Sequence, residues 1–151
     1  MNFLIIFAAK YLFLVSIILA GWFFITLSNP IKKKFISLAL VSFVFAFGLA
    51  KLIGAIFNDP RPFVSDHVSP LINHVADNGF PSDHTLLTMT IASVVFAYNR
   101  KLGIVLGILS VIVGFSRVLA GIHHPIDILG AMGIAIIAVA GIRSFMKKII
   151  A

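Results

Sequence analysis

Charged and acid–base side chains between residues 51 and 127 are of the kinds that bind and cleave phosphate compounds. Six residues form this set: Lys51, Arg61, His84, Arg117, His123 and Asp127. Cations grouped around one point suit a polyanion, because an arginine fork matches two phosphate oxygens and a lysine adds a point charge. Together they can neutralise the charge of a phosphoryl group without a metal ion. The residue types therefore predict a phosphate site.

Two predicted helix starts carry the acid–base residues of this set. Residues 80–85 indicate a helix N-terminus with Ser82 as its N-cap, where free backbone N–H groups and the helix dipole favour an oxyanion. A second helix is predicted to start within residues 123–127, where Asp127 follows His123 by four positions. A carboxylate at that spacing can hold the imidazole in one tautomer and stabilise its cation.

The elements that must position these residues are predicted to be membrane helices. Hydrophobic residues make up 60% of the 151 residues and charged residues only 11%, too few to cover a water-soluble fold. The absence of cysteine excludes a disulfide scaffold and a thiolate metal site. Five apolar runs, each ended by polar, Pro or Gly residues, indicate an all-α bundle of about five transmembrane helices. The runs cover roughly residues 3–28, 35–57, 84–98, 102–120 and 126–145.

The first apolar run is predicted to be a retained helix and not a cleaved signal peptide. It contains Lys10 in its middle, lacks a small-x-small cleavage site and continues into a basic turn. Because a lysine is costly at the bilayer centre, the spanning part is predicted to start near Tyr11, with residues 1–10 at the interface. Residues 1–151 are then expected to form a single membrane-embedded domain.

The order of the polar connections predicts the orientation in the membrane. Basic clusters without acidic residues follow the first, third and fifth runs, whereas all five aspartates and all five histidines lie in or beside the alternate connections. Basic loops face the cytoplasm, so the Asp/His segments and the N-terminus are predicted outside and the C-terminus inside. The net charge of +7 comes from these short clusters and not from a polar stripe, so nucleic acid is not an expected partner.

Counting from the basic clusters places four polar groups at one depth. His84 and Asp127 lie 16 residues before Arg100 and Arg143, Arg117 lies 16 after Lys101, and Lys51 lies 17 after Lys34. At 1.5 Å per residue this level is about 24 Å from the cytoplasmic side, close to the outer edge of a hydrocarbon core of about 30 Å. Ionisable groups at that depth are costly unless they face one another or a wet cavity, so their coincidence predicts a functional site.

These residues, in this order, resemble the three motifs of the type 2 phosphatidic acid phosphatase (PAP2) superfamily. The third motif, Ser-Arg-x5-His-x3-Asp, is present in full from Ser116 to Asp127. The second, Pro-Ser-Gly-His, occurs as Pro81-Ser82-Asp83-His84, and the first, Lys-x6-Arg-Pro, as Lys51, nine residues, then Arg61-Pro62. The resemblance covers residues 51–127, the core that carries the motifs.

The resemblance implies a two-step phosphoryl transfer that uses no metal or other cofactor. His123 would attack phosphorus and form a phosphohistidine that water later hydrolyses, and Asp127 would orient and activate it. His84 would protonate the leaving oxygen and then act as base for the water. The phosphate oxygens would be held by Lys51, Arg61, Arg117, Ser82 and the amides that follow Ser82.

Two departures from the family motifs limit what the resemblance implies. The first motif is three residues longer than usual, so either Lys51 lies one helical turn lower or the chain unwinds around residues 58–60. Asp83 replaces the usual glycine and adds a negative charge beside the expected anion, either as a helix N-terminal acid or in contact with substrate. The Pro-Ser-Asp-His form resembles the bacterial undecaprenyl-diphosphate phosphatase branch. Relatives commonly have six helices, so the missing one is expected to be N-terminal.

The favoured function is therefore hydrolysis of a lipid diphosphate in a bacterial cell membrane, with undecaprenyl phosphate returned to cell-wall synthesis. Phosphatidylglycerol-phosphate, phosphatidate and a lipid A phosphate are alternative substrates, and a small anion transporter or channel is an alternative of another class. A metal site is not expected, because the chain has no His-x-x-x-His and the nearby cations would repel an ion. His67, His74 and His124 are interpreted as interfacial residues without a role.

Overall fold

The structure is a computed structural model that describes residues 2–150, and the described chain is all-α. Five long or medium helices coincide with the five predicted apolar runs. Their bounds, with one short additional helix, are α1 Asn2–Thr26, α2 Asn29–Ile56, α3 Pro62–Ser65, α4 Asp83–Phe96, α5 Arg100–Leu119 and α6 Pro125–Ile150. The four-residue α3 was not predicted, because a single turn has no apolar periodicity to show in the sequence.

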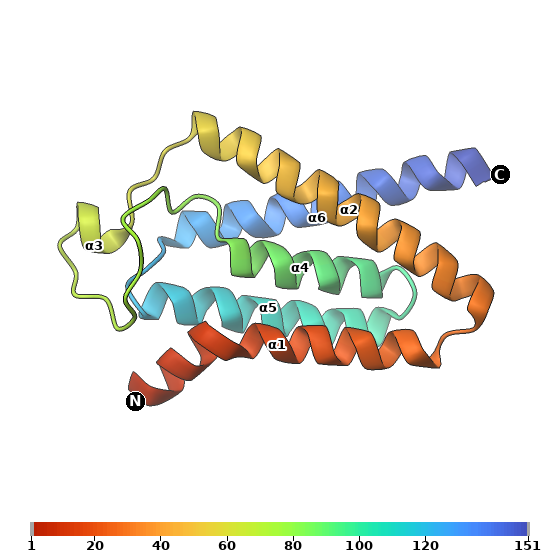
Figure 1. Cartoon of the computed structure of the whole chain (residues 1–151), viewed down its shortest axis with the longest axis horizontal. Coiled ribbons are helices and arrows are strands. Elements are labelled where there is room, and N and C mark those ends of the chain that lie inside the picture. Colours follow the sequence, from red (N-terminus) through yellow and green to blue (C-terminus); the bar gives the residue numbers. More distant parts are fainter. Residues whose placement is uncertain (1, 151) are drawn as a thin grey trace.

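Helix α4 lies at the centre of the bundle, with the other long helices around it (Figure 1). It has 14 residues, about 21 Å at 1.5 Å per residue, and most of them are buried. Three of its threonines are fully buried. The Thr88 and Thr90 hydroxyls donate to the carbonyls of His84 and Leu86, four residues earlier, so these polar groups are satisfied inside the apolar bundle.

The connections fall at two opposite ends of the bundle (Figure 1). The long connection of residues 57–82, with α3, lies at the end where α4 and α6 begin and α5 ends. The turns between α1 and α2 and between α4 and α5 lie at the other end, as does the C-terminus. The Asp/His segments are thus separated from the basic clusters by the length of the helices, as the alternation along the sequence predicted.

Helices α1, α2, α5 and α6 are long and apolar enough to span a membrane. Their large apolar side chains are exposed along the outside of the bundle, as on Leu40, Val44 and Ile137. Such a surface is stable in lipid and not in water, so the chain is a multi-pass membrane protein. Helix α1 is continuous through Lys10, which is exposed, so the structure shows no separate segment before Tyr11.

Close packing between helices brings α5 and α6 together near the end that carries the long connection. A Cβ added to Gly114 of α5 would overlap the side chain of Ile128 on α6 and approach Thr85 Oγ1 of α4 to 3.1 Å. Only a glycine allows these three backbones to approach so closely, which is the usual role of small residues between membrane helices. This contact fixes the starts of α4 and α6, and the residues that follow Gly114 on α5, relative to one another.

Candidate active site

A cavity of about 370 Å³ lies among the ends of the helices beside the long connection. It brings together five residues of the predicted set from separate parts of the chain. They are Lys51 of α2, Arg61 of the long connection, His84 of α4, Arg117 of α5 and His123 of the α5–α6 connection. Three of the four residues counted to one depth, Lys51, His84 and Arg117, thus line one cavity. The fourth, Asp127, contacts His123 of the same cavity.

His123, which lines the cavity, forms a buried hydrogen-bonded pair with Asp127. Their side chains are 2% and 0% exposed, and His123 Nδ1 lies 3.0 Å from Asp127 Oδ2. His123 is in the connection before α6, and Asp127 is in the first turn of that helix, where its carboxylate also accepts from the His124 backbone N–H at 2.9 Å. The helix start therefore fixes the carboxylate, and the carboxylate fixes the imidazole.

The neighbours of the second ring nitrogen decide the tautomer of His123. Its Nε2 lies 3.1 Å from Arg61 NH1 and 3.4 Å from Arg117 NH2. A guanidinium only donates, so Nε2 must accept and Nδ1 must carry the hydrogen that is donated to Asp127. Burial lowers the pKa of His123, and the guanidiniums of Arg117 and Arg61 lower it further. The ring is therefore neutral at pH 7, with its lone pair at Nε2 and facing two cations.

The two guanidiniums are themselves held by fixed acceptors. Arg61 donates from Nε to Asp77 at 2.6 Å and from NH1 to the Ile122 carbonyl at 2.8 Å. Arg117 donates to the Ala9 carbonyl of α1 at 3.0 Å, while its buried Nε has no hydrogen-bond partner among residues 2–150. A buried donor without a partner is costly, so this site favours an acceptor such as a phosphate oxygen.

His84 and Lys51 line other parts of the same cavity. The His84 ring lies edge-on to Phe13 of α1, with centroids 4.9 Å apart, and it makes no side-chain hydrogen bond in the described part of the chain. Lys51 is exposed and lies five residues before the end of α2. Because α2 ends at Ile56 and residues 57–61 are outside helices, the longer first motif is accommodated by unwinding around residues 58–60.

Ser82 and Asp83 are placed differently from each other. Ser82 is the N-cap residue of α4, as predicted, but its side chain makes no capping bond. It is fully buried, accepts from the Thr85 hydroxyl at 3.2 Å and is not among the residues that line the cavity. Asp83 is exposed and does line it. The prediction that the Ser82 hydroxyl binds phosphate gains no support from this position.

The chain that carries this site also matches a known protein family. The sequence profile of the PAP2 superfamily matches residues 9–151, which is nearly the whole chain. The chain belongs to the PAP2 superfamily. The expected membership, drawn from the three motifs, is thereby confirmed.

Curated PAP2 relatives and one solved structure agree with this assignment. The chain is 39% identical over 121 residues to undecaprenyl-diphosphatase BcrC of Bacillus subtilis, covering 80% of this chain and 61% of BcrC. It is 34% identical over 120 residues to the putative undecaprenyl-diphosphatase YbjG of Escherichia coli, covering 79% of this chain and 58% of YbjG. The chain thus spans about three fifths of the length of these relatives. The crystal structure of Aquifex aeolicus LpxE has the same fold, with a TM-score of 0.76, 24% identity and coverage of 94% and 86%.

The structure corrects the interpretation of two histidines outside the PAP2 motifs. His74 lines the cavity, with its ring centroid 6.4 Å from that of His123. The His124 ring lies between two carboxylates, 3.0 Å from Asp59 and 3.3 Å from Asp66. Neither is simply an interfacial residue. His67 is exposed and has a φ of 55°.

Sequence reasoning also missed the residues that hold the long connection against the PAP2 site. Asn78 donates to the carbonyls of Gly54 and Phe57 at the end of α2, at 2.7 and 3.1 Å. Its side-chain oxygen accepts from the backbone N–H of Asp59 at 2.9 Å. Asn78 thereby terminates α2 and fixes the segment that carries Arg61. These bonds join positions about 20 residues apart in a segment without periodicity, so no sequence pattern indicates them.

Proposed function

We propose that this PAP2 protein is a membrane lipid phosphatase that hydrolyses undecaprenyl diphosphate to undecaprenyl phosphate and phosphate without a metal ion. One observation carries the proposal: a buried, neutral His123 whose Nε2 lone pair faces the cavity between two guanidiniums, with Asp127 behind it. The substrate follows from BcrC and YbjG, whose names describe undecaprenyl-diphosphatases. The chain, residues 1–151, would act as one membrane-embedded domain.

In the first step, His123 Nε2 attacks the terminal phosphorus, and the bond from phosphorus to the bridging oxygen breaks. Asp127 stabilises the imidazolium that forms, and the Nδ1 hydrogen stays on His123. Arg61 and Arg117 hold the equatorial oxygens, because these oxygens would replace Nε2 as acceptors of the same N–H groups. Lys51 adds charge from the open side of the cavity. His84 donates a proton to the leaving undecaprenyl phosphate.

In the second step, a water molecule attacks phosphorus opposite His123, and the phosphorus–nitrogen bond breaks. His84, left neutral by the first step, takes a proton from the water. Phosphate leaves and His123 returns to its neutral form. The amides that follow Ser82 remain candidate donors to the phosphate, and Asp83 would limit how many negative charges the cavity accepts.

An anion channel or transporter is less well supported by the structure. A conducting path needs a polar lining through the bundle. Beyond the cavity, fully buried apolar side chains of α4 and α5 close the bundle, including Leu86, Leu106 and Val113. A chemical site that takes a phosphate from one side fits this arrangement better.

The proposed function is tested by phosphate release from purified protein in detergent with EDTA present. The substrates are undecaprenyl diphosphate, phosphatidylglycerol-phosphate, phosphatidate and a lipid A phosphate. We expect release without added metal, fastest from undecaprenyl diphosphate. Release only after Mg²⁺ is added would contradict the mechanism. A faster reaction with another of the four lipids would leave the chemistry in place and replace the substrate.

We also propose that the cavity faces the extracytoplasmic side and that the C-terminus is cytoplasmic. The basic clusters at the opposite end of the bundle support this orientation. The chain has no cysteine, so a single introduced cysteine is the only thiol in this sequence that can be labelled. Val75 is 72% exposed in the long connection, and we expect Val75→Cys to react with an impermeant thiol reagent on intact cells. Lys33→Cys, in the basic cluster, should react only after lysis; the reverse pattern would invert the orientation.

A further inference from the structure

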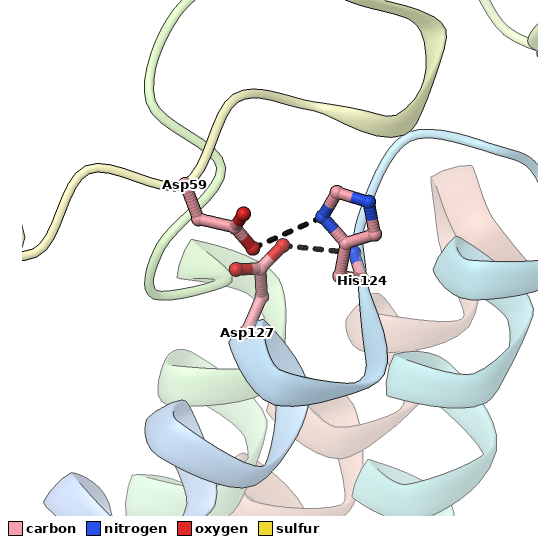
Figure 2. A group of neighbouring side chains, drawn as sticks. All are labelled: Asp59, His124 and Asp127. Carbon is pink, nitrogen blue, oxygen red and sulfur yellow. Dashed lines mark hydrogen bonds and ion pairs between the residues drawn. The ribbon is translucent and has the colours of Figure 1, made fainter. Parts of the chain in front are cut away.

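A second acid–base pair, formed by Asp59 and His124, lies beside Asp127 (Figure 2). Neither residue of this pair is among those that line the cavity. Asp59 belongs to the unwound segment after α2, and His124 to the connection before α6. The Asp59 carboxylate lies 3.0 Å from His124 Nδ1. The backbone of Asp59 is fixed from both sides, since its N–H donates to Asn78 at 2.9 Å and its carbonyl accepts from the Gly79 N–H at 2.8 Å.

The His124 backbone, as well as its ring, takes part in this arrangement. Its N–H donates to Asp127 Oδ2 (Figure 2). The same oxygen accepts from His123 Nδ1. Its ring faces Asp59 through one nitrogen and Asp66 through the other. With a carboxylate at each ring nitrogen, both nitrogens act as donors in the charged form. Burial lowers the pKa of His124, but Asp66 and Asp59 outweigh burial and raise it overall.

The Asp59 carboxylate also lies near the Asp127 carboxylate. Asp127 Oδ1 is fully buried and has no hydrogen-bond donor among the described residues. Asp59, His124 and Asp127 each place a ring nitrogen or carboxylate oxygen within 4.8 Å of the others. Two carboxylates so close bind a first proton more readily than either would alone. Burial and the neighbouring Asp127 accordingly raise the pKa of Asp59.

We propose that Asp59 and His124 are positioning residues that act through Asp127, holding its carboxylate toward His123 Nδ1 and supplying a second negative charge behind it. This inference rests on the proposed phosphatase function, because it assigns a role within the same reaction. His124 fixes Oδ2 through its N–H, and Asp59 fixes His124 through its ring. The added charge strengthens the hold of Asp127 on the His123 hydrogen and so favours attack by Nε2.

The two carboxylates of Asp59 and Asp127 also set the pH range in which the site works. When pH falls and Asp59 and Asp127 together take up a proton, less charge faces His123, so activity is lost on the acidic side. Neutralising Asp59 leaves one carboxylate, which keeps its charge to lower pH. The other titratable or charged groups around Asp59 and Asp127 come from the long connection and the α5–α6 connection. They are Arg61, Asp66, His123 and His124.

Asp59→Asn and Asp59→Ala, measured against the parent protein across pH, test the proposal. Both variants are expected to move the acidic limb of kcat/KM to lower pH by about one unit, because one carboxylate titrates in place of two. At neutral pH, Asp59→Ala should lower kcat by about 10- to 100-fold and change KM by no more than about twofold. Losses of this size are typical when a residue that orients a directly acting group is removed. Asp59→Asn retains an oxygen that accepts from His124, so its kcat should fall less than that of Asp59→Ala.

Further variants show whether Asp59 and His124 act together and through Asp127. His124→Ala combined with Asp59→Ala should cost little more than the larger single effect, and Asp59→Ala should cost little in an Asp127→Asn background. His67→Asn, in the exposed part of the connection, is the matched histidine control and should retain parent activity. Size-exclusion profile and melting temperature in detergent check folding, and Asp59→Asn, which is isosteric, keeps the test open if Asp59→Ala is unstable.

Two outcomes would overturn the inference. An acidic limb unchanged in Asp59→Asn would mean that Asp59 has only a structural role. Activity that EDTA removes and Zn²⁺ restores in the parent but not in Asp59→Asn would mean that the three groups bind a cation instead. A parent protein without any phosphate release would contradict the proposed function itself, whereas an active parent with unaffected Asp59 variants would contradict this inference alone.

Discussion

Replacing His123 with alanine is expected to lower kcat for phosphate release by at least about 10⁴-fold, because the variant lacks the atom that attacks phosphorus. The remaining cations still bind the substrate phosphate, so KM should change by less than about tenfold. The measurement is steady-state release from undecaprenyl diphosphate in detergent with EDTA. His67→Asn serves again as the control histidine.

The size of this effect follows from the position of Nε2. His123 is the group whose unprotonated nitrogen lies against both guanidiniums, at 3.1 and 3.4 Å, where the equatorial oxygens would bind. His84 lines the same cavity and makes no side-chain hydrogen bond in the described part of the chain. It suits proton transfer, which contributes roughly 10²- to 10⁴-fold. If His123→Ala kept more than a tenth of the parent kcat while His84→Ala abolished it, the roles of nucleophile and acid would have to be exchanged.

Asp127→Asn is expected to lower kcat by about 10³- to 10⁴-fold while leaving the shape of the site nearly unchanged. The side chain is fully buried and accepts two hydrogen bonds at Oδ2, from His123 Nδ1 and from the His124 N–H. In one orientation the asparagine oxygen takes the place of Oδ2 and accepts both bonds, but it lacks the charge that stabilises the imidazolium. In the other orientation its NH₂ group faces His123 and forces the hydrogen onto Nε2. A wrong tautomer of this kind removes the nucleophilic lone pair, and in a serine protease it costs about 10⁴-fold.

The melting temperature distinguishes this explanation from loss of folding. Asp127→Asn should melt within a few degrees of the parent in detergent, because volume and packing are retained. A variant that retains more than a tenth of parent kcat at neutral pH would show that Asp127 does not set the tautomer.

The helices and the central residues of the site were predictable because both follow regular spacings in the sequence. Apolar runs gave the five main helices, and equal distances from the basic clusters placed Lys51, His84, Arg117 and Asp127 at one end of the bundle. A membrane makes such counting reliable, since each span must start and end at the same two surfaces. The third motif supplied the pairing of His123 with Asp127, which the structure shows at 3.0 Å.

The residues that hold the site in place were not predictable, for a physical reason. Asp77 binds Arg61, Asn78 ends α2, and Asp59 meets His124 across 65 positions of sequence. These contacts depend on the path of residues 57–82, where no periodicity constrains the chain. Ser82 is a different case. It matches a motif and is the N-cap residue of α4, yet its buried hydroxyl accepts from Thr85 and it is not among the residues that line the cavity.

The central claim, that His123 is the nucleophile, is tested most directly by trapping its phosphorylated form. The parent protein is mixed with ³²P-labelled undecaprenyl diphosphate for milliseconds to seconds, denatured in alkali and analysed for protein-bound label. We predict label that is stable to alkali and labile to acid, as expected for a phosphohistidine, located in the peptide that contains His123 and absent from His123→Ala. Parent-level label in His123→Ala, or acid-stable label on another residue, would contradict the account.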